Sequence, residues 1–138
     1  MSRTLDMVHG IYDQFAQGNF ANALENVSPN VIWTERIPYY GTLTSHAEII
    51  VLFEEVVRNF DWGMNFDHFV DGGDIVVAVG TYSWLTKPSP PGEPRTDARV
   101  CHVWWRGDDG LISRYEQFVD TIKALHIIQP KIGATPSS

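Results

Sequence analysis

The amino-acid sequence predicts a single α+β domain in which helices come first and mostly antiparallel strands follow. The N-terminal part of the chain has apolar residues at helical spacing, and the rest alternates between polar and apolar residues as strands do. A chain of 138 residues is long enough for one hydrophobic core and leaves little room for a second. We assign residues 1–128 to this domain and residues 129–138 to a loose C-terminal tail.

Helical spacing and capping residues locate the helices. The first helix has one apolar face, formed by Leu5, Val8, Tyr12 and Phe15. Gly18 is a natural stop for it, and Asn19 can cap a second short helix that runs through Leu24. Ser45 and Glu48 have the spacing of a capping box and begin another helix. The buried face of that helix is formed by Ile49, Leu52, Phe53, Val56 and Val57.

Alternating or β-branched segments locate the strands. The predicted strands are residues 31–35, 62–70, 75–86, 95–106 and 111–120. Residues 36–44 contain Pro38 and Gly41 and are predicted to be a loop. Residues 121–128 have the pattern of a short terminal helix, which Pro130 would end.

Composition excludes several classes of protein. The net charge of −7, with no cluster of Lys and Arg, argues against nucleic-acid binding. No apolar run is long enough to span a bilayer and no signal-peptide pattern is present, so we expect a cytoplasmic protein without membrane contact. Cys101 is the single cysteine, which we interpret as a small buried hydrophobe. The five Trp, five Tyr and seven Phe are more than a core of this size needs, and they suggest an aromatic pocket or interface.

Several short segments, taken in order, resemble one family. They are the helix end at residues 18–20, the strand at residues 30–34, the tripeptide at residues 40–42 and the hairpin from His102 to Thr121. Their order and spacing resemble the SnoaL-like, ketosteroid-isomerase-like proteins of the NTF2-like superfamily. The resemblance implies N-terminal helices packed on a strongly curved sheet, which together enclose a cone-shaped cavity. It also implies a homodimer through the outer faces of the sheet, where Val103 and Trp105 would lie.

The same resemblance implies which residues carry chemistry. Glu35 occupies the position of the acidic residue that moves a proton in ketosteroid isomerases, and His102 occupies the oxyanion-hole position. The tyrosine of that site corresponds to Ile11 here, and Tyr12, one residue further, is turned by about 100° on the helix. This departure argues against a true ketosteroid isomerase. Gln117, at a position where the epoxide-hydrolase branch has an acid, argues against that branch.

The pocket wall is predicted from aromatic residues and from strand faces. The predicted substrate-binding residues are Tyr12, Trp33, Tyr39, Phe53, Trp84, Trp104, Tyr115, Gln117 and Val119. For most of them the alternative is ordinary core packing, which the pattern does not exclude. Glu35 could equally be a solvated strand-end carboxylate paired with Arg36, and His102 a core histidine bonded to a neighbouring side chain.

Two functions follow from these observations. The first is a cofactor-free acid–base enzyme, of isomerase or cyclase type, on a hydrophobic carbonyl compound such as a polyketide or steroid-like molecule. Glu35 would shuttle a proton, and His102, with Tyr12 or Tyr115, would stabilise an enolate oxygen. No metal-ligand spacing, nucleophile elbow or phosphate loop is present, so we expect neither metal nor cofactor. The alternative is a non-catalytic module, either a small-ligand binder or a dimeric assembly domain whose pocket is filled by its own aromatics.

Overall fold

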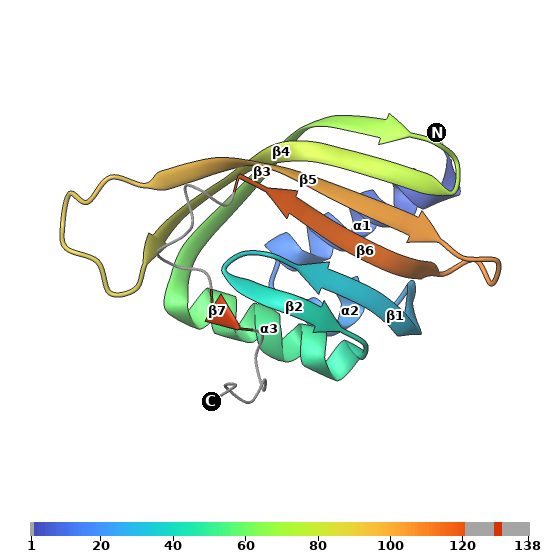
Figure 1. Cartoon of the computed structure of the whole chain (residues 1–138), viewed down its shortest axis with the longest axis horizontal. Helices are drawn as coiled ribbons and strands as arrows, with labels where there is room; N and C mark the ends of the chain where they lie inside the picture. Colours follow the sequence, from blue (N-terminus) through green and yellow to red (C-terminus); the bar gives the residue numbers. More distant parts are fainter. Residues whose placement is uncertain (1, 121–128, 131–138) are drawn as a thin grey trace.

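The computed structural model describes residues 2–120 and 129–130, and it has the predicted order of helices and strands (Figure 1). The elements are α1 Arg3–Ala16, α2 Phe20–Ala23, β1 Val27–Glu35, β2 Tyr39–Leu43, α3 His46–Asn59, β3 Phe60–Asp71, β4 Ile75–Thr86, β5 Thr96–Arg106, β6 Ile112–Val119 and β7 Gln129–Pro130. The predicted α+β class is confirmed, and each predicted strand is present, residues 75–86 with the predicted ends and the others with shifted ends. The predicted helix at residues 121–128 and the tail at residues 131–138 lie outside the described residues.

The strands form one mixed sheet in the order β3-β4-β5-β6-β1-β2-β7. Neighbouring strands are antiparallel except β1 with β6 and β2 with β7, which are parallel. Helix α3 connects β2 to β3, and Tyr39 on β2 packs against Phe60 at the start of β3, with ring centroids 6.4 Å apart. These two strands are far apart in the strand order. The sheet must therefore curve strongly around α3, while α1 packs on the central strands β4 and β5 (Figure 1).

Of the two predicted caps, Ser45 is confirmed and Asn19 is wrong, while Ser2 is a cap that was not predicted. The Ser2 hydroxyl accepts a hydrogen bond from the Leu5 amide, and the Ser45 hydroxyl accepts one from the Glu48 amide at 3.2 Å. Asn19 stands at the start of α2 but makes no side-chain cap. Its amide donates instead to the side chain of Gln14, because the two residues face each other across the turn after α1.

The loop predicted for residues 36–44 is wrong in its second half, because residues 39–43 form strand β2. This strand pairs with β1 in an antiparallel register that places Trp33 opposite Leu43 and Glu35 opposite Gly41. The hydrogen bonds of a hairpin partner outweigh the local preference of Gly41 for a loop. Residues 129–130, predicted as part of a loose tail, form β7 beside β2.

The inner and outer faces of β5 separate as the alternation predicts. Val100, His102 and Trp104 are buried on the inner face. Val103 and Trp105 lie on the other face and are partly exposed, and the Arg114 guanidinium covers the Trp105 ring at 4.8 Å. The homodimer through this outer face stays a prediction. Within the described part of the chain, no helix combines the length and the apolar character needed to cross a membrane.

Gly80 provides a test of the register between β3 and β4. It lies opposite Phe66, next to a bulge in β3. A Cβ atom at Gly80 would lie 2.3 Å from the Asn65 carbonyl oxygen and 2.8 Å from the Phe66 Cα atom. Because both atoms are backbone and cannot rotate away, we expect Gly80→Ala to lower the free energy of unfolding by about 1–3 kcal/mol in urea titrations.

Gly63→Ala is the matched control, since its Cβ atom would meet no atom closer than 3.7 Å on the same pair of strands. A Gly80→Ala protein as stable as the control would contradict the close approach of β3 and β4 at this point.

Candidate active site

A cavity of about 530 Å³ lies between the helices and the inner face of the sheet. Its wall includes most of the residues predicted for the site: Tyr12, Trp33, Glu35, Phe53, His102, Trp104, Tyr115 and Gln117. Aromatic rings form much of this wall, and the Tyr115 ring packs 4.2 Å from Trp33 and 4.5 Å from Trp104, measured between ring centroids. None of the described residues that line the cavity is Lys or Arg, so this mostly apolar wall has no fixed positive charge.

Three residues predicted as substrate-binding lie off the cavity wall. Tyr39 is buried on β2, where its hydroxyl accepts a hydrogen bond from Asn59 at 2.8 Å, because the segment is a strand and not a loop at the mouth. Trp84 is buried behind Trp62, whose ring stacks on it at 5.2 Å and takes its place at the cavity. Val119 lies near the end of β6 and packs against the core.

Sequence reasoning missed Tyr82, which lines the cavity from β4. Its side chain has the same strand parity as Trp84, and residues 76, 78, 80, 82 and 84 all face inward. This parity was the available signal. It could not rank Tyr82 above Trp84, because Trp62 from a neighbouring strand decides which of the two reaches the cavity.

Glu35 lies at the end of β1 with both carboxyl oxygens bonded. The Trp33 indole donates to Oε1 at 2.7 Å, and the Gln117 amide donates to Oε2 at 2.6 Å. Trp33 and Glu35 are two residues apart on one strand and therefore share the inner face. The structure thus replaces the proposed pair between Glu35 and Arg36 with two internal N–H donors in a buried site.

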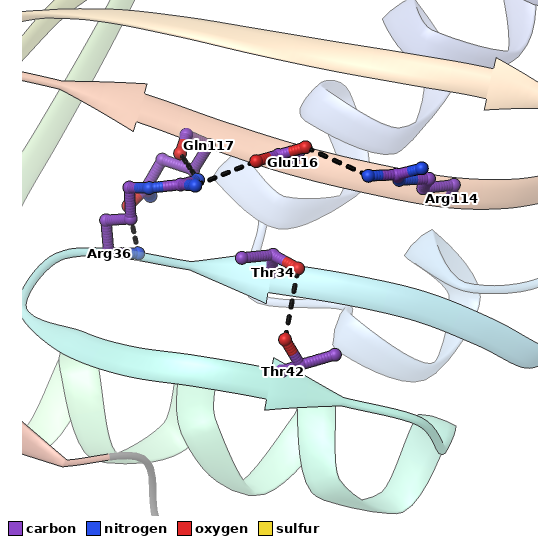
Figure 2. A network of polar contacts seen from close by, with 6 residues as sticks. All are labelled: Thr34, Arg36, Thr42, Arg114, Glu116 and Gln117. Carbon is purple, nitrogen blue, oxygen red and sulfur yellow. Dashed lines mark hydrogen bonds and ion pairs between the residues drawn. The ribbon is translucent and has the colours of Figure 1, made fainter.

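Gln117 is held in one orientation by the backbone of the segment after β1. Its Oε1 atom accepts from the Arg36 and Ile37 amides, both at 2.8 Å. Only an amide oxygen can accept these two bonds, so the Nε2 group must face Glu35 and the hydroxyl of Tyr82, which lies 2.9 Å away. Figure 2 shows Gln117 beside Arg36, whose guanidinium binds Glu116 at 2.7 Å, and Glu116 also contacts Arg114.

His102 is bonded through both ring nitrogens to tyrosines. Its Nδ1 atom lies 2.8 Å from the Tyr12 hydroxyl, and its Nε2 atom makes a short contact with the Tyr82 hydroxyl. The Trp104 indole donates to the same Tyr12 hydroxyl at 3.0 Å. Tyr12 therefore faces the cavity, while Ile11, the position that the family resemblance pointed to, is buried in the core.

No hydrogen bond joins Glu35 to His102 in the structure. Gln117 and Tyr82 lie between them, and the Gln117 amide donates to both Glu35 and Tyr82. A direct proton relay between Glu35 and His102 therefore has no contact to support it. The two groups are parts of one network but separate acid–base centres.

Burial makes the whole site neutral near pH 7. Burial raises the pKa of Glu35 to about 8, and the hydrogen bond from Trp33 offsets part of that rise. Burial lowers the pKa of His102 to about 3, so its imidazole is uncharged. Burial also raises the pKa values of Tyr12, Tyr82 and Tyr115, which keeps their hydroxyls protonated. Among the described residues, no group of three or more His, Cys, Asp or Glu could hold a metal ion.

Comparisons with known proteins agree with this fold. The SnoaL-like domain family matches residues 8–115. An NTF2-like protein from Burkholderia thailandensis is 29% identical, with a TM-score of 0.79 over 92% of this chain and 98% of that one. No curated protein matches the chain.

Two solved structures with lower identity have names that refer to chemistry or ligands. TerC, co-crystallised with polyporic acid, is 21% identical, with a TM-score of 0.76 over 91% of this chain and 98% of its own. A structure described as a putative polyketide cyclase from Xanthomonas campestris is 14% identical, with a TM-score of 0.73 over 91% of this chain and 96% of its own. At these identities the likeness concerns the fold alone.

Proposed function

The chain belongs to the SnoaL-like family, and from this premise we propose that it is a cofactor-free acid–base enzyme of isomerase or cyclase type. Its substrate is a hydrophobic compound that carries a carbonyl group. The observation that carries this proposal is the buried Glu35 carboxyl, which faces an aromatic cavity and has a pKa of about 8. A carboxyl that titrates near the working pH can both accept a proton and return it.

Glu35 is the group that moves the proton. In its ionised form the carboxylate is held by the N–H groups of Trp33 and Gln117, which fix its orientation without supplying a positive charge. It takes a proton from the carbon next to the substrate carbonyl and returns it at another position. Because Glu35 needs no contact with His102 for this, the separation of the two groups is compatible with the mechanism.

The substrate oxygen that becomes negative is stabilised by Tyr12. Both nitrogens of His102 already bond tyrosine hydroxyls, so His102 acts on the oxygen through Tyr12. The Trp104 indole donates to the same hydroxyl oxygen and keeps it in place. A preorganised O–H donor in an apolar site stabilises an enolate oxygen more than it stabilises the starting carbonyl.

The cavity indicates the class of substrate. A volume of about 530 Å³ suits a small organic molecule, and the aromatic wall without Lys or Arg favours an uncharged, largely apolar one. The structure named a putative polyketide cyclase supports a polyketide-like compound as the first class to test. TerC, co-crystallised with polyporic acid, supports a small organic ligand more generally.

Exchange of protons next to a carbonyl tests the proposal without knowledge of the product. A panel of hydrophobic cyclic and aromatic ketones is incubated with the protein in D2O, and deuterium uptake is followed by NMR. For a substrate that fits, we expect Glu35→Gln to slow exchange by a factor of about 10²–10⁴, the usual contribution of a positioned base. Binding of the ketone should change little, because a glutamine side chain has nearly the same shape as a glutamate side chain.

Glu116→Gln is the matched control, since Glu116 lies on the opposite face of β6 next to Gln117 and binds Arg36. It should exchange as fast as the wild-type protein. Equal exchange in wild type and Glu35→Gln would contradict the proposal, and equal exchange at the rate without protein would favour the second function.

That second function is a non-catalytic ligand-binding module. It is favoured by one observation, that the polar groups of Glu35, Gln117 and His102 all have partners within the protein. A binder would hold a ketone from the panel equally well in wild type and Glu35→Gln and promote no exchange in either.

A further inference from the structure

Tyr12, His102 and Tyr82 form a linear hydrogen-bonded group on the cavity wall. His102 is at its centre, with Tyr12 on Nδ1 and Tyr82 on Nε2. Each tyrosine oxygen also accepts one fixed N–H from outside the group. Trp104 donates to Tyr12 at 3.0 Å, and Gln117 donates to Tyr82 at 2.9 Å. The two ends differ in one respect, since the Tyr82 hydroxyl also has a hydrogen bond with the Tyr115 hydroxyl.

The number of hydrogens does not match the number of contacts. A neutral imidazole and two hydroxyls have three hydrogens, whereas the group has two contacts, one on each ring nitrogen. If Nδ1 carries the hydrogen, it donates to Tyr12, Tyr82 donates to Nε2, and the Tyr12 hydrogen is left over. If Nε2 carries it, the Tyr82 hydrogen is not used by His102 and can bond either a ligand or the Tyr115 hydroxyl. Tyr12, Tyr82 and Tyr115 all line the cavity, so the extra hydrogen belongs to a hydroxyl on the cavity wall in either case.

We propose that these three residues are a proton relay. The imidazole changes tautomer as one proton is passed along the cavity wall, from a ligand oxygen beside Tyr82 to another beside Tyr12. Tyr12 gives its hydrogen to a ligand oxygen and takes the Nδ1 hydrogen of His102. Nε2 takes the Tyr82 hydrogen, and Tyr82 takes a proton from a second ligand oxygen. Each atom that loses a hydrogen gains one, so the protein stays neutral and only the tautomer differs. The same steps in reverse restore it.

Gln117 separates this relay from Glu35. Its Nε2 group donates to both Tyr82 and Glu35, and an amide does not release its hydrogens at ordinary pH. The site therefore has two independent proton paths, with Glu35 acting at carbon and the relay acting between oxygens. If the relay serves the proposed function, on which this step rests, its substrate has both a carbonyl oxygen and a hydroxyl or enol group.

The tautomer of His102 can be measured in the ligand-free protein, so the test does not depend on the proposed reaction. With 15N-labelled histidine, the two ring-nitrogen chemical shifts distinguish the Nδ1–H form from the Nε2–H form, and His102→Gln assigns the signals. We expect wild-type shifts between the two limits, because both tautomers satisfy the same number of hydrogen bonds.

Removing one end of the relay should fix the tautomer. In Tyr12→Phe the Nδ1 hydrogen has no acceptor, and a buried unpaired N–H is disfavoured, so the Nε2–H form should dominate. In Tyr82→Phe the Nδ1–H form should dominate, because the Nε2 hydrogen would then have no acceptor. Tyr39→Phe is the matched control, since Tyr39 is a buried tyrosine bonded to Asn59 and lies off the cavity wall.

Shifts of the two variants in opposite directions support the relay. The same tautomer in wild type and both variants would overturn it, and so would wild-type shifts at either limit or a charged imidazole at pH 7. If one variant fails to fold, the wild-type shifts and the other variant still decide. The deuterium-exchange test of Glu35 and the 15N shifts of His102 are independent measurements, so the proposed function and the relay can fail separately.

Discussion

Gln117→Leu is expected to lower the free energy of unfolding by about 2–6 kcal/mol. Leucine is similar in size, but it removes the acceptor of the Arg36 and Ile37 amides, and each buried amide without a partner costs about 1–3 kcal/mol. It also removes the N–H donors to Glu35 and Tyr82. Urea titrations at pH 6, with the slope of the transition checked for constancy, measure this loss.

Gln14→Leu is the control for the change of side-chain chemistry, because Gln14 lies near the surface on α1 and its side chain bonds the exposed side chain of Asn19. It should change stability by less than about 0.5 kcal/mol. A Gln117→Leu protein as stable as this control would mean that the Gln117 bonds do not hold the segment after β1 in solution.

Gln117→Glu tests the accepting oxygen and the donating N–H group of the Gln117 amide separately. A carboxyl oxygen can still accept from the Arg36 and Ile37 amides, but the other oxygen would replace an N–H that lies 2.6 Å from Glu35. Two carboxyls at that distance are stable only while they share a proton. We therefore expect this variant to be more stable than Gln117→Leu at pH 5 and to lose that advantage as the pair ionises.

Strand alternation explains why much of the site could be predicted. On β5 and β6, successive side chains face opposite sides, so the alternation predicts His102, Trp104, Tyr115 and Gln117 on the inner face. These assignments use only local sequence, and all four residues line the cavity.

The rest of the site depends on contacts between distant segments. Tyr39 was placed at a loop because Pro38 and Gly41 interrupt the pattern, and only pairing with β1 makes the segment a strand. Tyr82 and Trp84 have the same parity, and the ring of Trp62 decides between them. Such choices depend on the curvature of the sheet and on the sizes of neighbouring side chains, which periodicity does not encode.

The free energy of unfolding should be nearly constant between pH 4.5 and 6.5 and should fall on both sides. Between these values the contributions of two buried groups change with pH in opposite directions and cancel. Glu35 has a pKa of about 8 in the folded protein against an ordinary value of 4.5, so it stabilises the fold below pH 4.5 and this contribution is lost as the pH rises towards 8. His102 has a pKa of about 3 against 6.5, so its contribution is complete above pH 6.5 and is lost as the pH falls towards 3.

Single variants should reveal the two contributions as slopes of opposite sign. One pKa unit corresponds to about 1.4 kcal/mol, so each group changes stability by roughly 3 kcal/mol across the window from pH 4.5 to 6.5. In Glu35→Gln only His102 remains, and stability should rise with pH across this window. In His102→Gln only Glu35 remains, and stability should fall. Urea titrations at half-unit steps of pH measure both slopes.

The exposed carboxyls do not disturb this comparison. Desolvation raises the pKa of Asp67, but hydrogen bonding and charge attraction to Arg99 outweigh it and lower that pKa, and this effect is equal in wild type and both variants. Any cost of the substitution itself, such as the lost acceptor of Trp33 or Gln117, is an offset that does not vary with pH. Parallel profiles in the three proteins would therefore mean that Glu35 and His102 titrate as exposed groups, and the buried neutral site proposed here would be wrong.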